Sequence, residues 1–520
     1  MDFDSGPALY LLRMRNAKPH HEATGFRRTI ELVLGVGCLV LISGCAVGPN
    51  YHAPAAPDVS GYTPDPLLPT VSSDVGGGTS QSFVPAKDIP GDWWTLFHSP
   101  GLNQLILEAL KNNPTLEAAQ ASLREARENV YAQEGSFFPS VTGDGTAERM
   151  KSSAASTGLP STPAFNLYNA SLSLSYTLDV FGGTRREVES LIAERDYEAY
   201  ELEASYLSLT ANIVTAAVTE ASVREQIKAT QEIVADEATQ LDIVKKRFDL
   251  GGASRADVLL QESNLRQEEA TLPPLQLQLS KTRNQLAAYA GRFPSEQIIE
   301  KFNLDDLRLP QELPVSLPSQ LVAQRPDIQA AAAQLHQASA NIGVAVANRL
   351  PQITLSGSLG SEALQASQLF TPGMGLWSIA GGISQPIFEG GTLLHKQKAS
   401  EQAFDEAAAQ YRSTVISAFQ DVANVLNALD YDAKTLKADL ATEQSAAESL
   451  KIATGQYKLG ATTYVDVLLS QQTHQTAVIA LVQARATRFS DTAALYQALG
   501  GGWWHRNDIQ RQPSIIENPL

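Results

Sequence analysis

Cysteine is almost absent from this chain. Two cysteines, Cys38 and Cys45, occur in 520 residues, and Cys38 lies in a stretch that we expect to be removed as a secretion signal. One remaining cysteine can form neither an internal disulfide nor a thiolate metal cluster. The stability of the fold must therefore come from packing.

Long apolar runs are also missing. The apolar run at 32–42 follows Arg27 and Arg28. It is shorter than the ~20 residues of a membrane-spanning helix, but it suits the h-region of a secretion signal. No later stretch approaches the length of a membrane helix. If the mature protein crosses a membrane, it must do so as β-strands, because in lipid every backbone polar group needs a partner within the protein.

Basic side chains and catalytic motifs are scarce too. Lys and Arg number 39 against 56 Asp and Glu, a formal net charge of −17. This charge argues against a nucleic-acid partner, which would require a basic patch. The six histidines that follow the predicted signal are scattered and show no metal-ligand spacing, and there is neither a Gly-x-Ser-x-Gly elbow nor a Gly-Lys-Ser/Thr phosphate loop. We therefore expect neither an enzyme nor a bound cofactor.

What the sequence does contain is a duplicated unit of about 200 residues. Arg247-Phe248-Asp249-Leu250-Gly251, followed by Asp257-Val258-Leu259-Leu260, reappears 209 residues later as Gln456-Tyr457-Lys458-Leu459-Gly460, followed by Asp466-Val467-Leu468-Leu469. Earlier in the unit, Pro114 recurs as Pro326 at an offset of 212. The unit is much longer than the repeats of solenoids and propellers. We therefore expect two copies of one fold that contribute alike to a single object.

Each copy predicts a very long helix, at 184–249 and 392–458, where proline is absent. Helices of that length would measure about 100 Å. Every seventh position is apolar, with the exceptions of Glu220 and Glu443, and this period indicates a left-handed supercoil seam. A soluble two-stranded coiled coil, tethered as a scaffold without a pore, is the alternative interpretation.

Shorter helices are expected to complete the rods. Opening helices are predicted at 114–134 and 326–348, and return helices at 254–290 and 463–499. Stacked end to end, a return helix and an opening helix nearly match one long helix. Each copy thus supplies two rods and the chain supplies four. Pro273-Pro274 should break the first return helix.

Four segments alternate between apolar and polar residues and predict β-strands, at 141–147, 170–180, 353–359 and 377–387. Within 170–180 the polar face would carry Ser171, Ser173, Ser175, Thr177 and Asp179. Such strands are typical of outer membrane barrels, although ordinary half-buried strands show the same pattern. Four strands cannot close a barrel, since the smallest single-chain barrels have about eight. If these strands enter a membrane, identical copies must join.

Two motifs point to known families. Ile42-Ser43-Gly44-Cys45 resembles the bacterial lipobox, which implies cleavage before Cys45, a diacylglycerol on its sulfur and an acyl chain on its new amino group. The remainder resembles the TolC-like outer membrane factors, in the NodT-type lipoprotein branch that serves resistance-nodulation-division efflux systems. The motifs that carry this second resemblance are Cys45-Ala46-Val47-Gly48-Pro49-Asn50-Tyr51, Asp92-Trp93-Trp94, the paired Leu-Gly turns and Ala498-Leu499-Gly500-Gly501-Gly502-Trp503.

The resemblance implies a mixed α and β membrane protein, a homotrimer with a 12-stranded β-barrel on a 12-helix periplasmic α-barrel. It implies a passive exit duct for drugs or other small solutes in the outer membrane of a Gram-negative bacterium. The implied partners are a periplasmic adaptor (membrane fusion) protein, an inner-membrane resistance-nodulation-division pump and outer membrane lipid. Type I protein secretion is an alternative use of such a duct.

We divide the chain into six parts on this basis. They are a signal peptide (1–44), a lipidated tether (45–90), the first copy (91–300), an equatorial connector (301–318), the second copy (319–502) and a C-terminal tail (503–520).

The two Leu-Gly turns join outgoing to returning helices and should lie at the far periplasmic end. The resemblance implies that these tips contact the adaptor. The tip residues are Leu250, Gly251, Gly252, Leu459, Gly460 and Ala461. Asp257 and Asp466 stand near the start of each return helix, where a carboxylate complements the helix dipole. Alternatively, three copies of Asp466 form an acidic ring at a periplasmic gate, with Tyr457 as a candidate contact for Asp257.

Overall fold

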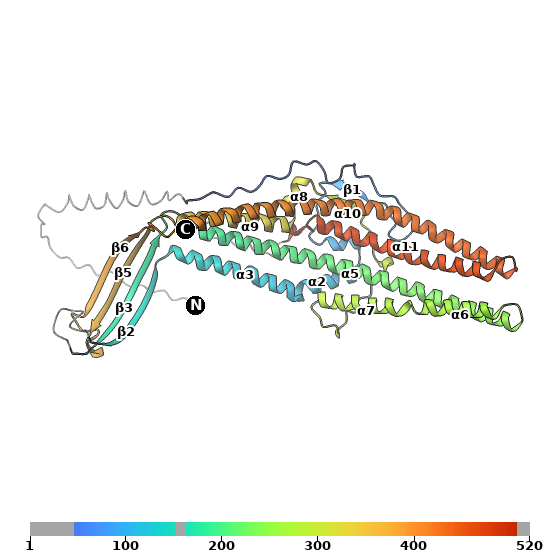
Figure 1. The fold of residues 1–520 in the computed structure, drawn as a ribbon, viewed down its shortest axis with the longest axis horizontal. Helices are drawn as coiled ribbons and strands as arrows, with labels where there is room; N and C mark the ends of the chain where they lie inside the picture. Colours follow the sequence, from blue (N-terminus) through green and yellow to red (C-terminus); the bar gives the residue numbers. More distant parts are fainter. Residues whose placement is uncertain (1–45, 152–162, 507–520) are drawn as a thin grey trace, which may run out of the picture.

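The computed structural model describes residues 46–151 and 163–506, so the predicted signal peptide, Cys45 and most of the predicted tail lie outside the described residues. The molecule is elongated, with a sheet at one end and helical rods along the rest of its length (Figure 1). Within the described ranges, no helix combines the length and the apolar character needed to cross a membrane.

The two long helices are α5 (Gly183–Asp249) and α10 (Thr392–Lys458), each of 67 residues. The second copy returns through one helix, α11 (Tyr464–Ala498). The first copy returns through two helices, α6 (Arg255–Glu269) and α7 (Leu272–Tyr289). The break falls immediately before the proline pair, which occupies the first turn of α7, where a missing backbone N–H is tolerated. The predicted interruption is confirmed.

The opening helices α3 (Pro114–Glu134) and α9 (Pro326–Ala347) each begin at the predicted proline. Two shorter helices that the sequence pattern did not predict, α2 (Pro100–Asn112) and α8 (Pro318–Gln324), precede them. Short 3₁₀ turns at Trp93–Phe97 and elsewhere fill the connections.

Each return helix is joined end to end to the opening helix of its own copy. The Asn113 side-chain amide donates to the carbonyl of Tyr289, the last residue of α7, at 2.9 Å. The Arg325 guanidinium donates to the carbonyl of Ala498, the last residue of α11, at 3.1 Å. Asn113 and Arg325 occupy equivalent positions before the two matched prolines. The predicted stacking of return helix on opening helix is therefore confirmed in both copies.

The predicted strands form one antiparallel sheet in the order β2-β3-β5-β6. The strands are β2 (Ser140–Met150), β3 (Phe165–Leu178), β5 (Gln352–Ala363) and β6 (Gly375–Ser384).

The register of the sheet keeps apolar and polar residues on opposite faces. Leu172 pairs with Leu359, which pairs with Trp377, and the next row joins serines, with 2.7 Å between the hydroxyls of Ser358 and Ser378. The prediction that Asp179 lies on the polar face of the sheet is wrong. This residue lies beyond β3 and its carboxylate accepts from the backbone amides of the first turn of α5, at 3.0 and 3.1 Å, as an anion at a helix start should.

The helices pack side by side in the same order in which their copies contribute strands to the sheet. Near the sheet, α3 packs on α5, α5 on α9 and α9 on α10; farther away, α6 and α7 pack on α5, α5 on α11 and α11 on α10. The molecule is thus a strip with two long edges. Along one edge lie β2, α3, α7 and α6, and along the other lie β6 and α10 (Figure 1).

The middle of the molecule holds the main apolar core. Trp93 is fully buried there, and its ring stacks on that of Tyr496 with centroids 5.3 Å apart. Two short parallel strands, β1 (Ser82–Pro85) from the predicted tether and β4 (Glu312–Val315) from the predicted connector, pair at the surface of this region. The tether and the connector are therefore bound together beside the core.

Both glutamates that interrupt the apolar stripes have partners. Glu220 is fully buried and ion-pairs with Arg224 on its own helix and with Arg283 on α7, at 2.7 Å for the second pair. Glu443 lies 3.3 Å from the ring nitrogen of His474 on α11. A buried charge is tolerated when it is paired, so these residues add a polar link between helices without breaking the seam.

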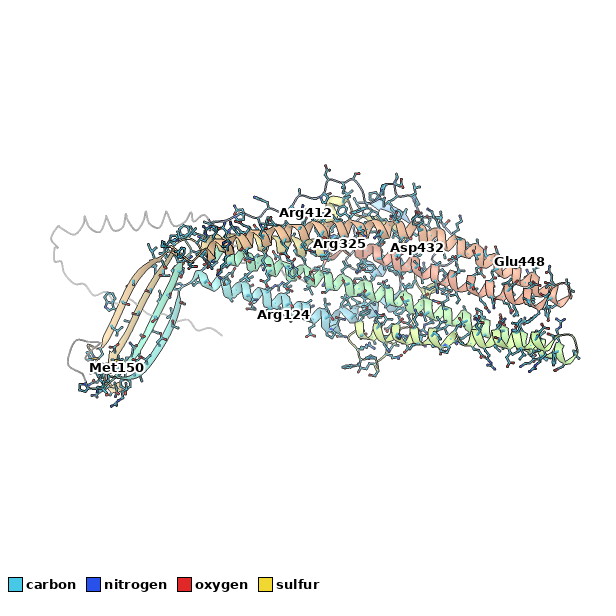
Figure 2. All side chains as sticks on the ribbon, in the orientation of Figure 1. Arg124, Met150, Arg325, Arg412, Asp432 and Glu448 are labelled. Carbon is cyan, nitrogen blue, oxygen red and sulfur yellow. The ribbon has the colours of Figure 1, made fainter. Side chains whose placement is uncertain are left out.

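The carboxyl groups of Asp432 on α10 and Asp491 on α11 interact where the two helices pack together. Burial, followed by the interaction with Asp491, raises the pKa of Asp432 to about 7 (Figure 2). The folded protein therefore retains a proton that the unfolded chain loses above about pH 4, and stability falls as the pH rises from about 4 to 7.

Asp432→Asn should consequently stabilise the protein at pH 8, by about 1–2 kcal/mol after allowance for solvent screening of this half-buried group. The gain should shrink toward pH 5, where the native carboxyl is already protonated. Melting curves at both pH values measure it. Asp430→Asn, which removes an exposed ion pair with Lys434, is the control; equal melting of all three proteins at pH 8 would contradict the assignment.

Candidate functional site at the helix tips and along the groove between α9 and α10

Both predicted tip turns close on a glycine in the left-handed region. The φ angle is +79° at Gly251 and +76° at Gly460. In each turn the amide of the following residue donates to the carbonyl five residues earlier, at 2.7 and 2.9 Å, the pattern of a Schellman motif. The two predicted Leu-Gly turns are present, and the two copies end their long helices in the same way.

The tips project into open space. Leu250 and Leu459 are 87% and 86% exposed, and the other predicted tip residues are exposed as well. A Cβ added at Gly251 or Gly460 would meet no atom within 4 Å. Each tip therefore offers a large apolar side chain that contributes little to the packing of the chain itself.

Asp257 and Asp466 begin the return helices in matching capping boxes. The carboxylate of Asp257 accepts from the Ser254 backbone amide at 2.8 Å, and that of Asp466 accepts from the Thr463 amide at 3.0 Å. Hydrogen bonds from the hydroxyls of Thr462 and Thr463 lower the pKa of Asp466. The helix-start role is thus present at both positions, and the gate role of Asp466 stays a prediction.

Tyr457 does contact the other copy, through a different partner from the one we expected. The guanidinium carbon of Arg247 lies 4.5 Å from the centre of its ring, and the ring of Tyr464 lies 5.1 Å away. The described side-chain hydrogen bond of Asp257 goes to Ser254 instead. A cation held over a tyrosine ring is attractive, so this pair links the ends of the two long helices.

A buried polar network behind the tips was not predicted. Glu237 on α5 is 2% exposed, and burial raises its pKa. Its carboxylate accepts from the side-chain amide of Gln261 on α6 and, at 3.4 Å, from that of Gln475 on α11. The hydroxyl of Tyr464 donates to Gln261. The network joins α5 and α6 of the first copy to α11 of the second copy. Its members are far apart in the sequence and form no local motif.

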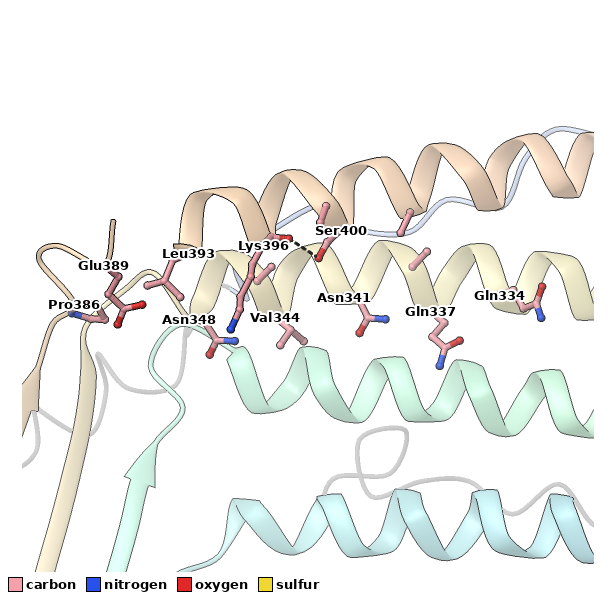
Figure 3. Close-up of a pocket in the computed structure, with 14 residues that line it drawn as sticks. Gln334, Gln337, Asn341, Val344, Asn348, Pro386, Glu389, Leu393, Lys396 and Ser400 are labelled. Atoms are coloured by element: carbon pink, nitrogen blue, oxygen red, sulfur yellow. Dashed lines mark hydrogen bonds between the residues drawn. The ribbon is translucent and has the colours of Figure 1, made fainter. Parts of the chain in front are cut away.

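A groove of about 790 Å³ with a mixed polar and apolar lining lies between α9 and α10 next to the sheet. Figure 3 shows the side chains of Gln334, Gln337 and Asn341 along α9, with Lys396 and Ser400 on α10. The Ser190 hydroxyl on α5 donates to Asn341 at 2.9 Å. Four uncharged amides line this groove together with apolar side chains such as Val344 and Leu393, so it offers hydrogen-bonding groups on a partly apolar surface.

Comparison with known proteins agrees with this architecture. The family described as outer membrane efflux protein matches residues 105–292 and 317–501, one match for each copy. This chain belongs to that family. Its members are efflux channel proteins rather than enzymes, and membership makes this chain the outer membrane component of an efflux system. The predicted resemblance is confirmed.

Relatives of the family match almost end to end. The antibiotic efflux pump outer membrane protein ArpC of Pseudomonas putida is 29% identical over 483 residues, covering 92% of this chain and 97% of ArpC. The probable outer membrane lipoprotein SilC of Salmonella typhimurium is 28% identical over 490 residues, covering 91% and 98%. The solved outer-membrane channel OprN is 26% identical with a TM-score of 0.80, covering 88% of this chain and all of OprN.

Proposed function

We propose that this protein is a passive exit duct formed by three copies of the chain. The observation that carries the proposal is the coincidence of the open edges: within the described residues, the edge strands β2 and β6, each paired on one side, lie on the same two sides as the outermost helical rods. Unpaired strand edges are costly in lipid. Three chains joined edge to edge would give 12 strands in a barrel above 12 helical rods.

The two faces of the sheet support insertion of the barrel into the outer membrane. Trp377 and Ile379 are 74% and 82% exposed on the apolar face of the single chain, where lipid would cover them. The serine rows would face a water-filled interior. The groove between α9 and α10, which carries amide side chains among apolar ones, would continue the wall of the duct below the barrel.

A pair of adjacent residues on β6 tests this orientation. Ile379→Lys should place a charge in lipid, at about 2–4 kcal/mol if near the bilayer midplane, and sharply reduce inserted trimer. Ser378→Lys, one residue away on the other face, should insert normally. Native mass measurement of the trimer and planar-bilayer recording of its current compare the two variants. Stable single wild-type chains that pass no current would overturn the duct proposal.

The partners we propose are a periplasmic adaptor protein and an inner-membrane resistance-nodulation-division pump. The exposed tips would meet the adaptor, and the pump would supply the energy. The proposed cargo is drugs or other small solutes. The name of ArpC, an antibiotic efflux pump outer membrane protein, favours this cargo over type I protein secretion.

We also propose that Cys45 carries the lipid anchor, with a diacylglycerol on sulfur and an acyl chain on nitrogen. Two facts support this assignment. SilC is named as a probable outer membrane lipoprotein, and the backbone of Ala46 packs against Gly182, at the junction of sheet and helices. The lipid would then enter the outer membrane beside the barrel.

The gate role of Asp466 is tested by its counterpart in the first copy. Asp466→Ala and Asp257→Ala each remove the carboxylate of a capping box. If three copies of Asp466 help seal the closed duct, only Asp466→Ala should raise resting conductance and antibiotic leakage. Single-channel recording of both variants measures this. Wild-type conductance in Asp466→Ala would remove Asp466 from the gate.

A further inference from the structure

Residues 46–51, which follow the predicted lipid-bearing cysteine, are bound between α5 and α9. The Val47 amide donates to the carbonyl of Phe181 at 3.0 Å, next to the end of the sheet. The hydroxyl of Tyr51 donates to the carbonyl of Ala332 on α9 at 3.3 Å. The segment thus spans helices that come from different copies of the duplicated unit.

Arg186 on α5 binds this segment directly. The residue is 3% exposed. Its Nε donates to the Val47 carbonyl at 3.0 Å, and one terminal nitrogen donates to the side-chain oxygen of Asn50 at 2.8 Å. The other terminal nitrogen donates to Glu189 at 2.6 Å. Every guanidinium nitrogen is therefore used, and charge-assisted bonds of this kind are among the strongest in proteins.

His336 on α9 contacts the same segment from a second helix. Its ring stacks on that of Tyr51, with centroids 4.3 Å apart and planes 13° apart. Its Nε2 lies 3.0 Å from the Glu189 carboxylate. Burial acts to raise the pKa of Glu189, but hydrogen bonds from His336 and Arg186 outweigh it and lower that pKa. Glu189 therefore contacts both Arg186 and His336 and fixes their side chains.

The fit also depends on two glycines that approach closely. Gly48 has φ +90°, and a Cβ at this position would lie 2.5 Å from the Cα of Gly343 on α9. Contacts below 3.0 Å force the backbone to move. A side chain at position 48 would push the segment out of the socket, so shape adds to the polar recognition.

We propose that α5 and α9 form a binding socket for residues 46–51, with Arg186 as its positioning residue. By holding Ala46 beside the end of the sheet, the socket fixes the point at which the amino-terminal lipid leaves the protein. Lipid and sheet then enter the bilayer at the same level. This anchoring consequence rests on the proposed lipidation of Cys45, whereas the binding of the segment does not.

Hydrogen exchange of the full mature chain, purified from membranes, tests the socket. Arg186→Met should raise the exchange rate of the backbone amides of residues 47, 48, 50 and 51 by about tenfold or more, the effect of losing charge-assisted bonds. Arg195→Met is the control, because Arg195 lies on the same helix but pairs with its neighbour Asp196. It should leave that exchange unchanged.

Tyr51→Ala and Gly48→Ala change only the bound segment and should give the same faster exchange, even if Arg186→Met fails to assemble. Gly455→Ala, where an added Cβ meets no atom within 4 Å, should have no such effect. Wild-type exchange in Tyr51→Ala and Gly48→Ala would overturn the socket. The mass of the amino-terminal peptide reports lipidation separately: an unmodified Cys45 would refute the anchor and leave the exchange result standing.

Discussion

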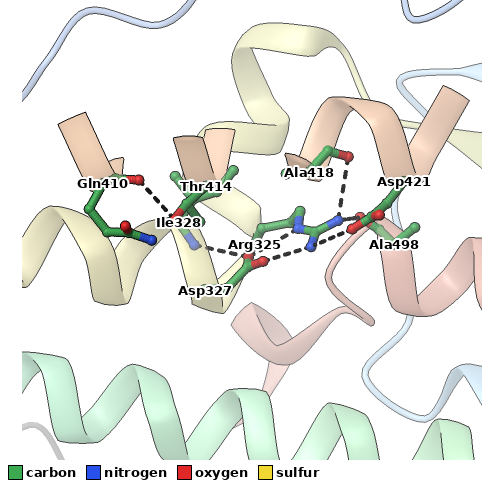
Figure 4. Close-up of polar contacts among 8 residues, drawn as sticks. All are labelled: Arg325, Asp327, Ile328, Gln410, Thr414, Ala418, Asp421 and Ala498. Atoms are coloured by element: carbon green, nitrogen blue, oxygen red, sulfur yellow. Dashed lines mark hydrogen bonds and ion pairs between the residues drawn. The ribbon is translucent and has the colours of Figure 1, made fainter. Parts of the chain in front are cut away.

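Replacing Arg325 with alanine is expected to lower the free energy of unfolding by about 3 kcal/mol. The guanidinium donates to both carboxylate oxygens of Asp327 at 3.0 and 2.6 Å, to Asp421 on α10 at 3.2 Å and to the final carbonyl of α11 at 3.1 Å (Figure 4). One side chain thus joins the start of α9 to two other helices. Its loss removes this donor from Asp421 and from the end of α11, and leaves Asp327 with the backbone amide of Ile328 at 2.9 Å.

Denaturation of the detergent-purified protein measures this loss, with two control variants. Arg412→Ala removes an exposed arginine from α10 (Figure 2) and should change stability little. Asn113→Ala removes the equivalent joint in the first copy, where neutral bonds are worth about 1 kcal/mol each. If Arg325→Ala unfolds like Arg412→Ala, the joint does not have the energetic role that its contacts indicate.

The double substitution Leu250→Asp with Leu459→Asp is expected to abolish efflux and leave the fold intact. Both leucines are almost fully exposed, so the single chain loses little packing. At an interface, by contrast, each would bury an unpaired carboxylate. A loss of 2 kcal/mol or more, typical of a central contact residue, weakens binding by about 30-fold or more.

The measurements are adaptor binding to the purified protein and drug susceptibility of a deletion strain that carries each variant. Leu68→Asp, in the tether at 72% exposure, supplies the same chemical change far from the tips and should support normal efflux. Wild-type efflux by the double variant, at normal protein levels, would exclude the tips as the adaptor contact.

Sequence alone predicted the elements whose signals are local. The seven-residue period of the long helices, the prolines that begin α3 and α9 and the glycines at the tips each act within a single helix or turn. The duplication strengthened these predictions, because the same signal occurs twice. Asp179 shows the limit of alternation, since the pattern could not tell the last strand position from the first cap of α5.

The missed residues all act over long sequence distances. Arg325 bonds Ala498, 173 residues away, and Arg186 bonds Asn50, 136 residues away. His336 looked like one scattered histidine until the fold brought Tyr51 to it. For Tyr457, the sequence correctly indicated a partner in the other copy, but could not choose Arg247 over Asp257. No spacing rule encodes such contacts, because their geometry exists only after the helices pack.

The proline pair makes the two hairpins mechanically unequal. In the first helical hairpin, formed by α5 with α6 and α7, the return segment is interrupted between α6 and α7, whereas α11 in the second hairpin is one continuous helix. Bending an interrupted helix costs less free energy than bending a continuous one, since fewer helical hydrogen bonds must stretch. If the proposed duct widens or narrows at its far end, α6 and α7 should therefore bend relative to each other near residue 271, whereas α11 should move as one rigid helix.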